Sequence, residues 1–195
     1  TGLFYKIVCA PLFLVNGVPI EGYILQKSMV QLLFIFFDFA GYSLIAVGVG
    51  KLVGLHTPTN FDKPFLSRSV GEFYTKWHIS LYKIAYKNIY IPLQYFMLSK
   101  VPHIHSYLCN VVSLLVLFIF IGFWHGFVKD YLIWGGLLGL TISIEKIVRA
   151  AFQTTPLKKY MPDKWIINII GPLYTFSMVA LLIHNALKHF LGENQ

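Results

Sequence analysis

Two histidines lie in apolar surroundings where a chain rarely places an ionisable group. His125 lies near the end of the run FIFIGFWHGF, between Trp124 and Gly126, and His78 lies in FYTKWHISLY. An imidazole titrates near neutral pH, so in a water-poor cavity it can take the proton from a hydroxyl as that oxygen attacks. The same pattern fits a histidine that only hydrogen-bonds one helix to another, because Gly122 and Gly126 have the G-x-x-x-G spacing of close helix contacts.

Asp38 interrupts the apolar run LLFIFFDFAGYSLIAVGVG. A charge near the centre of a bilayer costs at least about 2.5–3.5 kcal/mol. The carboxyl group is therefore either structural, being protonated or paired inside the protein, or directly functional. In both cases we expect it to face the protein interior, with Tyr42, one helical turn later, and Ser43 as local partners.

The remaining polar candidates are weaker. The stretch PTNFDKPF places Asn60, Asp62 and Lys63 among prolines and phenylalanines, and taken alone it predicts a solvated turn. The two cysteines form neither a CxxC pair nor a Cys/His cluster, so we expect no metal site. We interpret the other five histidines as structural or interfacial: His56, His103, His105, His184 and His189.

The composition predicts a membrane protein. Of 195 residues, 56% are hydrophobic and 12% are charged, whereas soluble domains carry about 25% charged residues. We expect an all-α polytopic fold, because several apolar runs reach the roughly 20 residues that span a bilayer. The chain begins at Thr1 and we expect it to be part of a longer protein. The expected spans are residues 29–52, 108–127, 131–151 and 166–187, with a short or interfacial helix at 3–15.

The long segment between the first two spans, residues 53–107, should contain an amphipathic or re-entrant helix. Ser69 and Glu72 have the spacing of a capping box, so we predict a helix that begins there and ends or kinks at Pro92. At about 100° per residue its lysines share one stripe, and His78 lies about 160° from it. His78 should therefore point inward, toward the cavity of His125. The alternative is an interfacial helix whose histidine only anchors it to lipid headgroups.

The net charge of +8 favours a membrane partner over nucleic acid. No basic run exceeds two residues, Lys158 and Lys159, and the other charges are scattered between apolar spans. Such scattered charges are typical of membrane topology signals and of contacts with anionic lipid. The basic segments 53–107 and 152–165 fall on one side of the predicted spans, which we expect to be cytoplasmic.

Three motifs together resemble the membrane-bound O-acyltransferase (MBOAT) family in order and spacing. They are FFDFAGYS, NFDKPFLSRSVGEFYTKWHISL and GFWHG. The resemblance implies a polytopic enzyme that moves an acyl group from a thioester to a hydroxyl, with residues 1–195 forming the C-terminal portion of a single membrane domain. It also implies site residues: His125 and His78 as catalytic, with Trp124, Trp77, Asp38, Asn60, Asp62, Lys63 and Ser80 binding substrate or supporting the site.

Within this family, two bacterial branches are similar to the chain. FFDFAGYS and NFDKPF resemble the branch that transfers D-alanine to teichoic acid, and NIYIPL resembles alginate-type polysaccharide O-acetyltransferases. The implied donor is a phosphopantetheine-linked acyl carrier protein or another acyl thioester, and the implied acceptor is a cell-envelope polymer such as lipoteichoic acid. No bound cofactor or metal is implied. The chain departs from both branches at Lys87 and Asn88, where an Arg-Asp pair is usual.

Two other classes of function fit the intramembrane Asp and His. A transporter or proton pathway uses such residues, although we find neither repeated halves nor matched broken helices. A non-catalytic membrane scaffold is the third reading, which the missing Arg-Asp pair favours.

Overall fold

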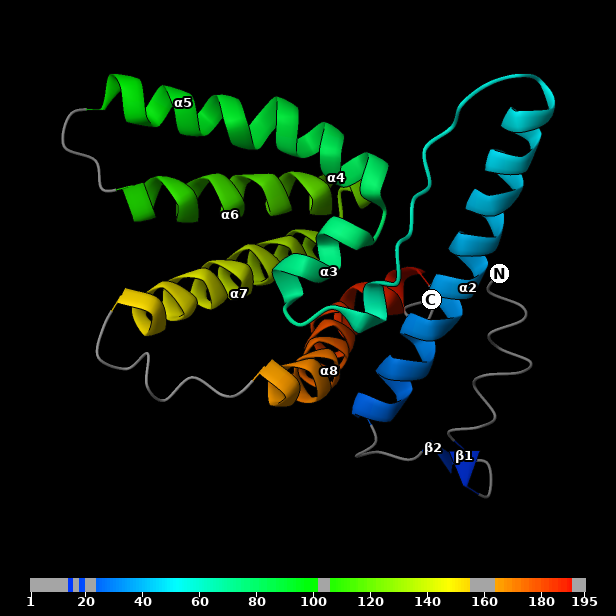
Figure 1. Cartoon of the computed structure of the whole chain (residues 1–195). Coiled ribbons are helices and arrows are strands. Elements are labelled where there is room, and N and C mark those ends of the chain that lie inside the picture. The colour runs from blue at the N-terminus through cyan, green and yellow to red at the C-terminus, as the bar shows by residue number, and fades with distance from the viewer. Residues whose placement is uncertain (1–13, 16–17, 20–23, 102–105, 155–163, 191–195) are drawn as a thin grey trace. The chain divides into compact units, whose positions relative to one another are not determined.

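The computed structural model describes residues 14–15, 18–19, 24–101, 106–154 and 164–190, and almost all of them are helical (Figure 1). The all-α prediction is confirmed apart from one short pairing, in which β1 (Leu14–Val15) lies antiparallel to β2 (Val18–Pro19). The helix expected at 3–15 is therefore wrong at residues 14 and 15, and its remainder lies outside the described residues.

Four helices are long and apolar enough to cross a membrane, which confirms the four predicted spans and a multi-pass membrane protein. Each helix begins a few residues before its predicted start, because residues outside the most apolar part of the run also take helical backbone. The helices are α2 (Ile24–Leu52), α6 (Ser106–His125), α7 (Lys129–Thr154) and α8 (Lys164–Phe190).

The chain divides into two compact units, and α8 contributes to both. The first unit holds residues 1–60 and 176–195. Within it the Ser28 hydroxyl donates to the Ile24 carbonyl at 2.7 Å and lies 2.8 Å from Nδ1 of His184. A His184 tautomer with the proton on Nδ1 can donate to this hydroxyl, which would link α8 to α2.

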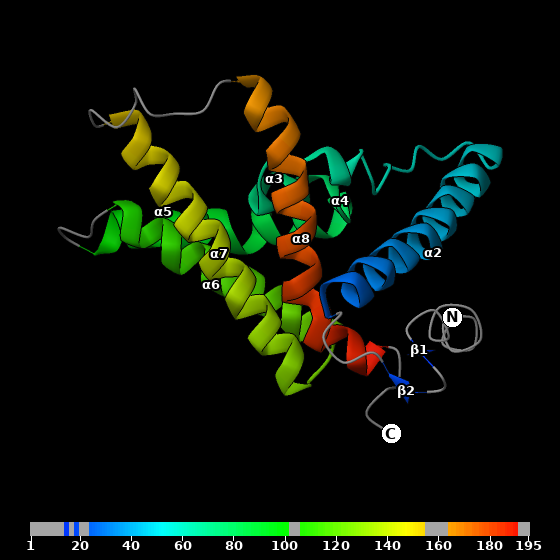
Figure 2. The same cartoon turned by 90° about the horizontal axis from the view of Figure 1, so that it is seen from below.

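The second unit, residues 61–175, is built on the antiparallel pair α6 and α7, which lie side by side in Figures 1 and 2. Glycines bring the two backbones together. A Cβ atom at Gly122 would collide with the Tyr131 carbonyl, and one at Gly135 would collide with the Phe118 carbonyl. Gly139 is similar, since its Cβ would lie 2.9 Å from the Leu115 Cα. Small residues thus set the spacing of this pair, as is common between membrane helices.

The segment before α6 differs most from the prediction. The expected single helix is broken at residues 77–78 into α3 (Val70–Lys76) and α4 (Ile79–Ala85). Of the two outcomes predicted at Pro92, an end or a kink, the end is wrong: α4 continues through a π turn, η4 (Tyr86–Tyr90), into α5 (Ile91–Lys100), which packs along α6. In the π turn the Ile91 N–H donates to the Tyr86 carbonyl, five residues back. This wider turn accommodates the proline, whose ring would press on the carbonyl four residues earlier in an α-helix.

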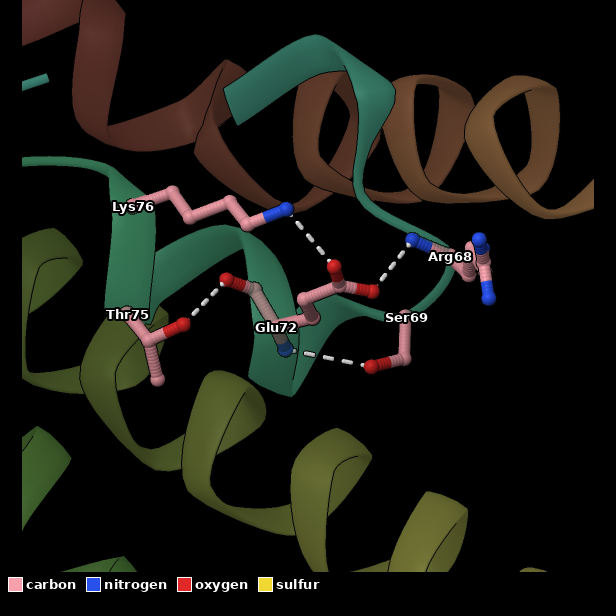
Figure 3. Close-up of polar contacts among 5 residues, drawn as sticks. All are labelled: Arg68, Ser69, Glu72, Thr75 and Lys76. Atoms are coloured by element: carbon pink, nitrogen blue, oxygen red, sulfur yellow. Dashed lines mark hydrogen bonds and ion pairs between the residues drawn. The ribbon is translucent and has the colours of Figure 1, made fainter. Parts of the chain in front are cut away.

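The break also removes the basis of the lysine stripe. Lys83 and Lys87 are exposed on the second half of the segment, whereas Lys76 ends α3 and pairs with Glu72 at 2.7 Å. The helix start at Ser69 is confirmed: its hydroxyl accepts from the Glu72 N–H at 3.1 Å (Figure 3). The other half of the capping box is shifted by one residue, because the Glu72 carboxylate accepts from the Arg68 N–H at 2.9 Å rather than from Ser69.

Candidate functional site

Two histidines that are 47 positions apart in the sequence line one small cavity in the second unit. Its volume is about 30 Å³, enough for one or two waters. The cavity is mostly aromatic, so a polar group inside it would meet few competing partners. Its walls are formed by Tyr74, Trp77, His78, Leu81, Tyr82, Ile121, His125 and Trp134.

His125 is placed by the end of α6. It is the last helical residue, and Gly126 follows with φ 154°, a backbone conformation that favours glycine. Its ring lies edge-on to Trp134 of α7 at 5.3 Å and to its neighbour Trp124 at 4.9 Å. The glycine-packed pair of helices therefore fixes the ring between two indoles while leaving the residue exposed on one side.

His78 is placed by the break between α3 and α4. Its backbone is left-handed, with φ 48° and ψ 53°, which is uncommon for a residue with a side chain. Its ring lies edge-on to Trp124 at 5.8 Å, so this indole contacts both imidazoles. Burial lowers the pKa of His78, so the neutral ring is favoured near pH 7.

The loop NFDKPF holds this break in place. Phe61 and Trp77 form an antiparallel bridge, in which the Asp62 N–H donates to the Lys76 carbonyl at 3.1 Å. The Phe61 ring also lies edge-on to Trp77 at 5.1 Å. Among the described residues other than glycine, Lys63 shares the left-handed backbone of His78, with φ 47°, and it turns the chain into η3 (Pro64–Leu66). The loop thus contacts Lys76 and Trp77, the two residues before His78, through its backbone and an aromatic ring.

The polar side chains of that loop do not line the histidine cavity. Asp62 and Lys63 are exposed, as the prediction of a solvated turn requires, and Asn60 is half-buried at the end of the first unit. Ser80 is the second residue of α4, half-buried, and also lies outside the cavity lining.

Asp38 is exposed on α2 and bonds to no side chain in the described part of the chain. Neither expected partner holds it: Tyr42 is 70% exposed, and the buried Ser43 hydroxyl has no hydrogen-bond partner among the described residues. The interior pairing predicted for Asp38 is therefore not found within the first unit.

Lys87 and Asn88 lie in the π turn, and both are exposed. The Asn88 amide donates to the Ile84 carbonyl at 2.7 Å, so it bonds to the backbone of its own helix and forms no ion pair. The departure from the Arg-Asp pattern is therefore local and lies outside the histidine cavity.

A larger cavity of about 480 Å³ shares a lining residue, Tyr82, with the histidine cavity. Burial, followed by the nearby Tyr86 and Tyr90, raises the pKa of Tyr82 to about 12, so its hydroxyl stays protonated. These three tyrosines stack along the segment with ring centroids 5.7 and 4.5 Å apart. The charged residues of this cavity are Glu72, Glu145, Lys146 and Arg149.

Glu145 was missed by the sequence analysis. Its carboxylate accepts from the Val70 N–H at 2.8 Å, from the Gly71 N–H at 3.1 Å and from the Tyr174 hydroxyl at 3.1 Å. The signal was available, because an acid inside the span predicted at 131–151 is as unusual as Asp38 in the first span.

The described residues contain no group of three His, Cys, Asp or Glu that could hold a metal ion. His78 and His125 could supply two nitrogen ligands at most. The residues that surround them are aromatic and apolar, so the described site is suited to acid-base chemistry and not to coordination by protein side chains alone.

Comparison with known proteins places the chain. A sequence model of the MBOAT, or membrane-bound O-acyltransferase, family matches residues 24–187. The chain belongs to this family. It is 30% identical over 203 residues to a teichoic acid D-alanyltransferase of Streptococcus thermophilus, covering 92% of this chain and 48% of that protein. The corresponding protein of Bacillus subtilis is 34% identical over 149 residues, covering 76% and 37%.

Relatives with other acyl groups match the MBOAT chain as well. A peptidoglycan O-acetyltransferase of Helicobacter pylori is 31% identical over 147 residues, covering 75% of this chain and 25% of its own length. The chain thus spans about half or less of the length of these curated relatives. His78, the NFDKPF loop and His125 all lie inside the matched family region.

Proposed function

We propose that the protein to which this chain belongs is a membrane-bound O-acyltransferase that moves an acyl group, D-alanyl or acetyl, from a thioester to a hydroxyl of a cell-envelope polymer. The observation that carries this proposal is the shared cavity of His78 and His125, which come from separate segments and meet across Trp124. Membership of the MBOAT family supports the reaction class, and relatives named for D-alanyl and O-acetyl transfer support the two acyl groups.

His125 is the general base of the proposed reaction. A hydroxyl has a pKa far above 7 and attacks a thioester slowly. As its oxygen bonds to the thioester carbonyl carbon, the imidazole takes the hydroxyl proton. The C–S bond then breaks, the thiolate leaves and takes up this proton, and an ester and a free thiol result. The exposed side of His125 leaves room for the acceptor.

His78 orients the acceptor or donates to the oxygen that becomes negative. Its left-handed backbone turns the ring toward the same cavity, and the loop at Phe61 holds that conformation. Donors that point at such an oxygen are worth more in a water-poor cavity than in water. Asp38, Asn60, Asp62, Lys63 and Ser80 have supporting roles in this proposal, since none of them lines the cavity.

The donor is a thioester, which we expect on the phosphopantetheine arm of an acyl carrier protein. The cavity of about 480 Å³ has the volume of a small-molecule site and shares Tyr82 with the histidine cavity, so it can take the end of such an arm. The acceptor is a polymer hydroxyl, with lipoteichoic acid as the first candidate. No tightly bound cofactor takes part.

The test uses the full-length protein in lipid vesicles, with a carrier protein loaded with D-alanine or acetate as a thioester and with lipoteichoic acid as acceptor. We expect one free thiol for each ester formed. A transporter would move acyl groups across the vesicle membrane without releasing thiol. A scaffold would do neither, and either result would overturn the proposal.

A further inference from the structure

The N-terminus of α3 is held by a carboxylate from another helix. Four N–H groups at the start of a helix lack partners within it. In α3 the N–H groups of Val70 and Gly71 donate to Glu145 of α7. The N–H of Glu72 donates to the Ser69 hydroxyl (Figure 3). The next N–H, from Phe73, makes the first bond of the helix itself, to the Ser69 carbonyl. Side chains therefore satisfy the N–H groups of the first three helical residues, and two of these three depend on one carboxylate.

Glu145 is well suited to this task. Its charge lies at the positive end of the helix, where an anion is stabilised. Its two oxygens each take one amide, so the bond fixes the rotation of α3 as well as its position. The Tyr174 hydroxyl of α8 donates to Oε1, the oxygen that also accepts from Val70, and holds the carboxylate from a third helix.

The other end of α3 carries His78. The helix has only seven residues, about 10 Å, and it ends at the Trp77–His78 break. Phe73 stacks on Trp77 at 5.3 Å, so side-chain packing links the body of the helix to the break. A short helix that is clamped at one end transmits a shift of that end to the other, because close-packed interiors are stiff.

We propose that Glu145 is a positioning residue: it holds α3 so that His78 lies in the cavity of His125. The proposal rests on the proposed function, because it concerns the part of His78 in acyl transfer. It adds a residue on a third segment of the chain, one that lies in a membrane span and does not line the histidine cavity.

The first test does not need activity. Diethyl pyrocarbonate modifies neutral histidines, and mass spectrometry reads each site in the intact protein. Glu145→Gln keeps the shape of the side chain but removes its charge and one acceptor, so we expect the half-buried His78 to react several-fold faster. Ser69→Ala weakens the same helix end and should give a smaller increase in the same direction. Exposed His56 serves as the reference, and an unchanged rate at His78 in both variants would overturn the proposal.

A matched control separates the α3 contact from the α8 contact. Tyr174→Phe removes only the hydroxyl that donates to Glu145 and leaves both amide bonds. We expect the His78 reaction rate to stay within about twofold of wild type. A rate as high as that of Glu145→Gln would show that the contact with α8, and not the α3 cap, positions His78.

The second test is a double-mutant cycle on acyl transfer by the full-length protein. Glu145→Gln should lower kcat by on the order of 10- to 100-fold in the wild-type background, the size of effect that a misplaced group produces. In the His78→Ala background it should have little further effect, since the two residues act as one unit. Equal losses in both backgrounds would mean that Glu145 only stabilises the fold. If wild type transfers no acyl group, the proposed function fails, while the labelling result still decides whether Glu145 places His78.

Discussion

The two regions that supply the histidines are built in different ways. The pair α6 and α7 is regular along its length, and backbone contacts at Gly122, Gly135 and Gly139 set its spacing. Residues 61–90 instead pass through a 3-10 turn, two seven-residue helices and a π turn. His125 is therefore placed by the packing of long helices, whereas His78 is placed by a few hydrogen bonds and one uncommon backbone conformation. The base should tolerate local changes better than its partner.

The largest effect should come from the base itself. His125→Ala should lower acyl transfer by about 10²–10⁴-fold, because it removes the imidazole that takes the hydroxyl proton as the oxygen attacks. Protein yield, membrane insertion and thermal unfolding should stay close to wild type, since the residue ends its helix. His56→Ala removes an exposed histidine and is the control. Wild-type turnover in His125→Ala would remove this residue from the mechanism.

One added methyl group should disrupt the close contact of α6 and α7. Gly135→Ala places a methyl group against the Phe118 carbonyl, so it should lower the free energy of unfolding by about 1–3 kcal/mol, the cost of overpacking. A Cβ atom at the neighbouring Gly136 would meet nothing within 4 Å, so Gly136→Ala should be neutral or slightly stabilising. Thermal unfolding in detergent measures both. Equal effects would show that the backbones are not in contact here.

The irregular region should respond to backbone conformation rather than to volume. Lys63 is exposed and left-handed, so Lys63→Val should destabilise the protein by about 1–2 kcal/mol, while Lys63→Gly should be neutral or stabilising. Its exposed neighbour Asp62 is not left-handed, so Asp62→Gly should give no gain. Urea titration of the three variants compares them. Stabilisation by Asp62→Gly as large as that by Lys63→Gly would contradict the assigned conformation.

The smallest effect concerns pH. Burial lowers the pKa of His78, so the folded state binds its proton less readily than the unfolded state, where the pKa is about 6.5. The contribution of His78 to stability is then fully present above pH 6.5 and decreases as the pH falls toward the lower folded value. His78→Asn keeps a residue that accepts the left-handed conformation but does not titrate. Unfolding between pH 7.5 and 5 should depend less on pH in this variant, and an unchanged dependence would assign the effect to other groups.

Glu72 should also contribute to the pH dependence of unfolding, but at lower pH than His78. Burial raises the pKa of Glu72, but hydrogen bonds from Lys76 and from the Arg68 N–H, together with their charges, more than offset this and hold the pKa below its usual value. Its contribution to stability is present above about pH 4.5 and is lost as the pH falls through the folded value. Glu72→Gln should flatten the acid end of the unfolding curve and leave the range above pH 5 unchanged.

The regular region could be predicted from the sequence, and the irregular one only in part. Hydropathy identifies the four spans because a bilayer imposes length and composition on every helix that crosses it. The start of α3 was predicted because Ser69 and Glu72 form a local signal. The break at His78 was not, because the residues around it have a helical pattern and histidine carries only a weak preference for left-handed backbone.

The site was predicted through its motifs and not through its geometry. A helical wheel predicted that His78 points toward His125, but the wheel assumed a continuous helix. In the structure the left-handed backbone of His78, next to the bridge at Phe61, gives that orientation instead. The contact of Glu145 with Val70 joins residues 75 positions apart, and no pattern within either segment encodes it. The partners expected for Asp38 were chosen only because they are its neighbours in sequence, and neither of them bonds to it.

The π turn at Tyr86–Tyr90 rotates the helix that follows it about its own axis. An α-helix advances about 100° per residue, and the wider turn takes up one extra residue without ending the helix. Every side chain of α5 is therefore rotated by roughly that angle from where an uninterrupted α-helix would put it. Deleting one residue from this turn would keep the helix but turn a different face of α5 toward α6. The face that α5 presents to α6 is thus set by one extra residue in the turn just before Pro92.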